Sequence, residues 1–153
     1  MKKLLILFLI INSFVPLIFG SDILTQEWRK LTPLVSTCED VKKILSVNNC
    51  QFPNSNYKFS NYNISLTFST GEDGWNVSEG IVLNVGVSLK KLINLNDYEK
   101  DLGNYKILPV DDLPDYRRYI NETKGIELLV TKDKLVQHIY MFPPKKRRNS
   151  SVR

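Results

Sequence analysis

Apolar and polar residues alternate along much of the second half of the chain. In residues 62–69 the apolar residues Tyr62, Ile64, Leu66 and Phe68 are separated by small polar ones. A period of two is typical of a strand that buries one face and exposes the other to water. Five more short runs predict strands, and they cover residues 57–59, 81–89, 116–120, 126–130 and 136–142.

The segment before residue 50 has the period of a helix. Thr25 can cap a short helix over residues 27–31, which Pro33 interrupts. The segment STCEDVKKILSV, residues 36–47, predicts a better helix. Its serine and threonine stand three positions before acidic residues, which is the spacing of a capping box, and its apolar residues form one stripe.

These elements predict an α+β fold with two short N-terminal helices packed on a five- or six-stranded antiparallel sheet. The turns ETKG and KDK, at residues 122–125 and 132–134, are short enough for hairpins. No strand–helix–strand rhythm indicates a parallel sheet. Residues 92–104 are ambiguous, with a short helix near residues 96–102 as one reading, and PVDDLP at 109–114 predicts a loop.

The first twenty residues have the layout of a cleavable secretory signal. Lys2 and Lys3 precede an apolar run that ends at the small residues Gly20 and Ser21. The alternative is a retained anchor, but the run is short for a bilayer and contains Pro16. The sequence therefore predicts a signal at 1–20, one globular domain at 21–144 and a basic disordered tail at 145–153. The expected compartment is the periplasm or the medium.

The net charge of the whole chain, +5, differs in sign from that of the predicted domain. Residues 21–144 contain 14 Lys and Arg against 16 Asp and Glu, so that stretch carries a net charge of −2. A domain of that sign repels phosphates, which argues against specific nucleic-acid binding. The excess positive charge lies in the signal and in the tail KKRRNSSVR, whose Lys145, Lys146, Arg147 and Arg148 could make weak contact with an anionic surface.

Cys38 and Cys50 are the two cysteines of the chain. In an oxidising compartment a disulfide between them is the leading interpretation, and two free thiols are the alternative. Cys38 starts a predicted helix, where a thiol pKa is lowered, so a reactive cysteine is a minor third reading. A cysteine hydrolase also needs a histidine partner.

No motif in the sequence names a reaction, a metal or a cofactor. His138 is the one histidine, and in simple alternation it shares a strand face with Val136 and Tyr140. The carboxylates cluster at residues 72–73 and 111–115, without the spacing of a calcium loop. We therefore predict no catalytic residue, no metal ligand and no cofactor, and we expect these side chains to be solvated or structural.

Trp75 lies in the segment GWNV, next to turn residues. An aromatic side chain on a loop can stack on a sugar ring or anchor a partner protein, and it can equally pack as a lid on the sheet edge. Trp75 is therefore a candidate binding residue, together with the four basic residues at 145–148. A partner would be a protein or an envelope polymer.

Three segments resemble a group of small, uncharacterised exported bacterial proteins that is best represented in acidobacteria. The motifs are W-x4-PL-x-ST-x2-DV (residues 28–41), GWNV (residues 74–77), and Y-x-N-E-x2-GI followed by I-Y-x-x-P (residues 119–143). The resemblance implies export and a similar fold, but no activity. Cys38 departs from the group, which tends to have arginine there. The architecture is also distantly similar to BamE/SmpA-like outer-membrane assembly proteins.

The leading functional hypothesis from the sequence is a non-enzymatic exported binding or structural module. One alternative is a carboxylate-dependent hydrolase of an extracellular or cell-wall polymer, which would use Asp111, Asp112 and Asp115. Another alternative is binding of a polyanion or a membrane surface through the basic tail.

Overall fold

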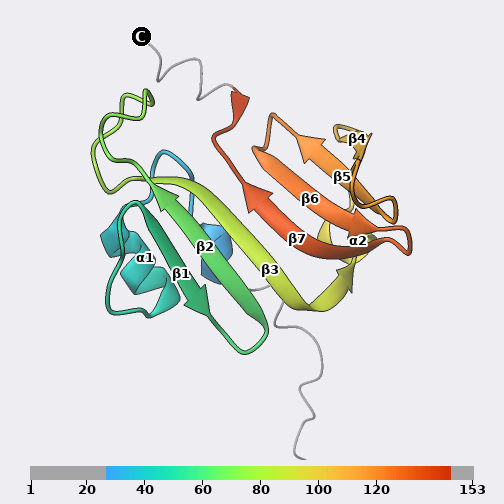
Figure 1. The fold of residues 1–153 in the computed structure, drawn as a ribbon, viewed down its shortest axis with the longest axis horizontal. Coiled ribbons are helices and arrows are strands. Elements are labelled where there is room, and N and C mark those ends of the chain that lie inside the picture. The colour runs from blue at the N-terminus through green and yellow to red at the C-terminus, as the bar shows by residue number, and fades with distance from the viewer. Residues whose placement is uncertain (1–26, 146–153) are drawn as a thin grey trace, which may run out of the picture.

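The fold is a single continuous antiparallel sheet of seven strands (Figure 1). A computed structural model of the chain describes residues 27–145. The strand order is β1-β2-β3-β7-β6-β5-β4, and every neighbouring pair is antiparallel. The strands are β1 (Asn54–Lys58), β2 (Tyr62–Phe68), β3 (Val82–Asn94), β4 (Lys106–Pro109), β5 (Tyr116–Asn121), β6 (Ile126–Thr131) and β7 (Leu135–Met141). The helical elements are the 3₁₀ turn η1 (Glu27–Lys30), α1 (Cys38–Leu45) and α2 (Leu95–Tyr98).

Helix α1 begins at the predicted capping box. The Asp40 N–H donates to Thr37 Oγ1 at 3.2 Å, and the Thr37 N–H donates to Asp40 Oδ2 at 2.8 Å. These bonds satisfy backbone donors that the first helical turn leaves free, and the bond from the Thr37 backbone holds the pKa of Asp40 below its usual range. The helix ends at Ser46, whose φ of 55° is left-handed.

The predicted pair of helices on five or six strands is wrong in two respects. The first helix is only the four-residue turn η1, because the i→i+3 bond from Leu31 N–H to Trp28 O is followed at once by Pro33. The sheet has a seventh strand, β4, whose four residues are all exposed. A strand without a buried face shows no alternation of apolar and polar residues, so no periodic pattern predicts it.

One face of the sheet carries the hydrophobic core. Trp28, Val41, Val85 and Leu128 are fully buried there, and Leu31 is nearly so. The covering layer of that face is thin and consists of η1, α1 and the segment that follows β3 through α2 to Tyr105. No helix within residues 27–145 is long and apolar enough to span a bilayer.

Two bulges change which residues face this core. In β7, Leu129 pairs with His138 but Val130 pairs with Val136, so Gln137 is an extra residue. Val136 therefore joins the core while His138 faces the opposite side, which corrects the predicted shared face of these two residues. In the pairing of β2 with β3, Thr67 faces Asn84 and Phe68 faces Val82, and this shift brings Val82 into the core.

Cys38 and Cys50 lie in the geometry of a disulfide, with their Cα atoms 6.1 Å apart. Cys38 is the first residue of α1, and Cys50 lies in the segment that leads to β1. The pair thus ties the start of the helix to the entry of the edge strand, in agreement with the leading interpretation of the sequence.

Replacing both cysteines, as Cys38→Ser with Cys50→Ser, should lower the free energy of unfolding by roughly 3 kcal/mol. The reason is that a cross-link between residues 12 apart restricts the unfolded chain. Urea denaturation of the two proteins measures the difference. A reducing agent should destabilise the natural chain and leave the double variant unchanged, whereas equal stability of both proteins would contradict the cross-link.

Candidate functional site

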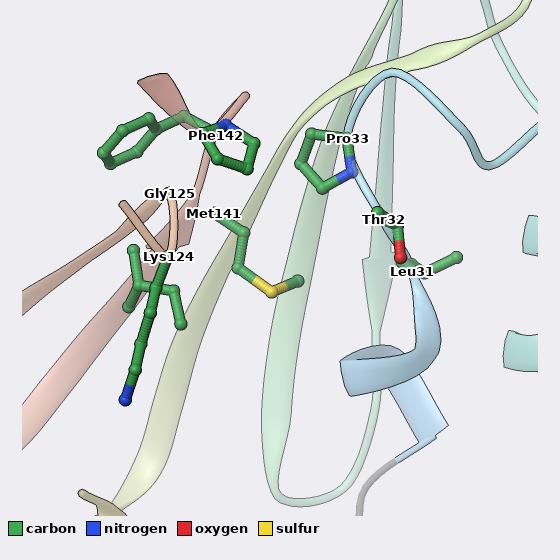
Figure 2. Close-up of a pocket in the computed structure, with 9 residues that line it drawn as sticks. Leu31, Thr32, Pro33, Lys124, Gly125, Met141 and Phe142 are labelled. Carbon is green, nitrogen blue, oxygen red and sulfur yellow. The ribbon is translucent and has the colours of Figure 1, made fainter. Parts of the chain in front are cut away.

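Among residues 27–145, a groove lies where the thin covering layer leaves part of the core face of the sheet uncovered. We call it the η1 groove, and it contains two adjacent hollows of about 220 Å³ each. The first hollow is shown in Figure 2, and its lining residues are Leu31, Thr32, Pro33, Lys124, Gly125, Ile126, Met141, Phe142 and Pro144. The second hollow is lined by Trp28, Arg29, Tyr98, Glu99, Lys124, Ile126 and Met141.

The floor and walls of the first hollow are mainly apolar. Met141 extends from the end of β7 into the space between the two walls, toward Leu31 and Thr32 (Figure 2). Pro33 stands opposite the Phe142 side of the hollow. Covering this floor with another apolar group is favourable, because it removes apolar surface from water. The hollow therefore suits an apolar side chain or ligand.

The wall beside β6 depends on a glycine. Gly125 has φ 68°, and a Cβ atom there would overlap the carbonyl oxygen of Phe142. A hydrogen bond from Phe142 N–H to Gly125 O, at 2.9 Å, holds the two backbone segments together. The turn before it is fixed by Asn121, whose buried side-chain Oδ1 accepts from Lys124 N–H at 2.9 Å. These contacts hold Phe142 and Pro144 against the β5–β6 turn and so form the wall.

Glu99 closes one end of the second hollow. Its carboxylate accepts from Lys124 Nζ at 2.6 Å and from the Tyr105 hydroxyl at 3.1 Å. Burial by itself would raise the pKa of Glu99, but the bonds from Lys124, from the Asp101 N–H and from Tyr105 together hold it below its usual range. Burial and the neighbouring Glu99 carboxylate raise the pKa of Tyr105, so its hydroxyl remains a donor.

The rim of the groove has more positive than negative charge. The Arg29 guanidinium lies 4.6 Å from the Tyr98 ring centroid and 5.5 Å from the Trp28 centroid, and it has no carboxylate partner within residues 27–145. Of the charged residues that line the groove, Arg29 and Lys124 are basic and Glu99 is acidic. A ligand with an acidic group beside its apolar part would therefore complement the groove.

The predicted binding residues do not gather at this groove. Trp75 is half-buried in the loop between β2 and β3, where its N–H lies 3.5 Å from Asp73 Oδ1, and it lines neither hollow. Lys145 lies near the groove, next to Pro144. Lys146, Arg147 and Arg148 lie outside the described residues. The predicted signal and the Thr25 cap lie outside them too, so all of these remain predictions.

The carboxylates considered for hydrolysis lie on the loop after β4 and at its junction with β5. Asp111 and Asp112 are exposed on the loop after β4, and Asp115 forms an ion pair with Lys132. That ion pair holds the pKa of Asp115 below its usual range, first through the hydrogen bond from Lys132. Within residues 27–145, no three His, Cys, Asp or Glu side chains come together as metal ligands would.

A second group of polar residues lies on the other face of the sheet. His138 Nδ1 and Ser88 Oγ are 2.9 Å apart, although the two residues are fifty positions apart in sequence. Arg118 binds Glu127 with two hydrogen bonds of 2.6 and 2.8 Å. Sequence reasoning missed both pairs because each joins residues on different strands. The strand pairing was the only signal that could have found them.

Glu99 should make the stability of the fold depend on pH in the acid range. An unfolded glutamate titrates near 4.5 and the folded one titrates lower, so the unfolded state binds more protons between these two values. The contribution of Glu99 to the free energy of unfolding is therefore fully present above about pH 5, and it is lost as the pH falls through the pKa of the folded state. Glu99→Gln should cost most near neutral pH and progressively less toward pH 3, as measured by urea denaturation. The exposed Glu79→Gln is the control, and an equal cost of Glu99→Gln at every pH would contradict this role.

Gly125→Ala should destabilise the protein more than Gly74→Ala does. Both glycines have positive φ, at 68° and 78°, so each alanine carries a backbone strain of about 1–3 kcal/mol. Only at position 125 does the added Cβ also meet backbone atoms, because nothing lies within 4 Å of a Cβ at position 74. The difference between the melting temperatures of the two variants measures the cost of the backbone contact at position 125. Equal melting temperatures would contradict that contact.

Comparisons with known proteins give little further guidance on the site. No protein-family model and no curated protein sequence matches the chain. Among solved structures, a DUF4309 family protein, YjgB from Bacillus subtilis, has a TM-score of 0.49 and 16% sequence identity, over 76% of this chain and 84% of that one. This likeness supports no argument about function.

Proposed function

We propose that this chain is a non-enzymatic exported binding module that holds an apolar and acidic peptide segment of a partner protein in the η1 groove. The observation that carries the proposal is a mainly apolar hollow that adjoins a second hollow, where Arg29 has no carboxylate partner among residues 27–145. Export rests on the N-terminal signal that the sequence predicts.

The size of the hollows favours a peptide over a compact small molecule. Small-molecule pockets have volumes of roughly 300–1,000 Å³ and enclose most of their ligand. Each hollow here has about 220 Å³, and the two lie side by side, sharing Lys124, Ile126 and Met141 in their linings. Two shallow neighbouring hollows suit two side chains of one extended segment, in the way that anchor residues fill pockets at protein interfaces.

The charge of the rim indicates the composition of that segment. Arg29 contacts the Tyr98 and Trp28 rings, which holds its guanidinium at the second hollow, and it has no carboxylate partner among residues 27–145. A carboxylate on the ligand could accept from it, and a charged hydrogen bond of this kind is among the stronger polar contacts. We therefore expect apolar anchors flanked by aspartate or glutamate.

Selection of a random peptide library displayed on phage against the mature protein tests this function. Enriched peptides should pair apolar anchors with acidic residues, and one of them, made synthetically, should bind in fluorescence polarisation. Thr32→Trp should weaken that binding by about tenfold or more, because the indole fills the first hollow. Arg29→Glu should weaken it similarly by reversing the charge at the second hollow.

Val35→Trp is the matched control for the filling variant. Val35 is 54% exposed and lies three positions from Thr32, outside the residues that line the groove. Its binding should equal that of the natural chain. Peptides that bind Thr32→Trp and the natural chain equally well would show that the groove is not the binding site.

A further inference from the structure

Within residues 27–145, no helix covers the face of the sheet opposite the core (Figure 1). Its central positions follow from the register. Ser65 on β2 pairs with Gly86 on β3, which pairs with Tyr140 on β7. The next row joins Asn63, Ser88 and His138 across the same three strands. We call these six residues the outer-face site.

Gly86 makes a shallow floor at the centre of this site. A Cβ atom at that position would lie 2.9 Å from Ser65 Oγ and 3.8 Å from Cδ2 of Tyr140. The serine side chain and the tyrosine ring therefore both approach the glycine backbone closely. Tyr140 nevertheless remains 42% exposed. An aromatic ring that rests against a glycine and is open to water can act as a platform on which a flat ligand stacks.

The hydrogen-bonding groups next to this platform are neutral, and the exposed cation Lys58 lies beyond Asn63, on the neighbouring strand β1. Ser88 and His138 bind each other, and burial lowers the pKa of His138, so the imidazole is neutral at neutral pH and can donate or accept. Burial also raises the pKa of Tyr140, so its hydroxyl keeps its proton. The neighbouring Glu127 is neutralised by its two hydrogen bonds from Arg118.

A hollow of about 270 Å³ adjoins the platform, and Asn63, Ser65 and Ser88 contribute to its lining. Asn56, Tyr57, Lys58 and Ile64 complete that lining. Asn63 Oδ1 is shielded from solvent and has no hydrogen-bond partner among the described residues. An unpaired buried acceptor costs free energy, and rotation of the amide toward a ligand that donates a hydrogen bond would relieve that cost.

From these features we infer that the outer-face site binds a neutral carbohydrate, with one sugar ring stacked on Tyr140 and hydroxyl groups bound by Asn63, Ser65, Ser88 and His138. A sugar hydroxyl both donates and accepts, which matches the mixed serine, amide and imidazole groups. A negative charge on the ligand would find only the exposed Lys58 among the residues of this site and its hollow, and an ion pair so open to water contributes little. This site is separate from the η1 groove and does not depend on the function proposed for it.

Isothermal titration of the mature protein with cellohexaose, chitohexaose and maltohexaose tests the inference, and oligogalacturonate is the acidic comparison. At least one neutral hexasaccharide should bind, and the acidic one should not. Tyr140→Ala should weaken binding by about tenfold or more, whereas Tyr140→Phe, which keeps the ring, should bind nearly as well as the natural chain. Gly86→Ala should weaken it too, because its Cβ fills the floor while only the mobile end of Ser65 has to move.

Phe52→Ala removes a different aromatic side chain of similar exposure, 48%, and should leave carbohydrate binding unchanged. Thr32→Trp in the η1 groove should also leave it unchanged. The inference is overturned if no neutral hexasaccharide binds, if only the acidic one binds, or if Tyr140→Ala binds as well as the natural chain. Equal losses in Tyr140→Ala and Phe52→Ala would overturn it as well, because they would indicate a loss of fold.

Discussion

The structure depends on covering the apolar face of a seven-stranded sheet with very little chain. One eight-residue helix, one 3₁₀ turn and the segment around α2 provide that cover. Trp28 supplies much of that cover, because its large side chain is fully buried although η1 has only four residues. Within residues 27–145, the η1 groove is the part of the apolar face that this cover leaves open.

Much of the sheet followed from the sequence because the signals were local. Alternation along residues 62–68 gave β2, and the capping box at Thr37 gave the start of α1. Local signals failed where burial was absent or the register changed. The exposed strand β4 has no apolar face to detect, and Gln137 adds one residue to β7, which reverses the face of His138 relative to Val136. Bulges of this kind depend on the partner strand, which a pattern within one segment does not contain.

The candidate sites were harder to predict than the fold because both join residues that are distant in sequence. The η1 groove brings Leu31 and Pro33 beside Met141, and the outer face brings Ser88 to His138. Sequence reasoning had chosen Trp75 and the basic tail, which stand out as single residues or as one charged run. Strand β7 contributes to both sites, because Met141 faces the groove and Tyr140 faces the outer side. Alternation along one strand thus separates an apolar surface from a polar one by the thickness of the sheet.

The exposed strand β4 also bears on how the protein behaves in solution. It forms one free edge of the sheet, and Ile107 and Leu108 on it are 55% and 43% exposed. A free edge with apolar side chains is a template on which another chain can add a strand, which leads to aggregation. Here the edge is only four residues long, begins with Lys106 and ends with Pro109, which has no N–H to donate. These three features limit edge-to-edge growth and favour a molecule that stays dispersed when concentrated.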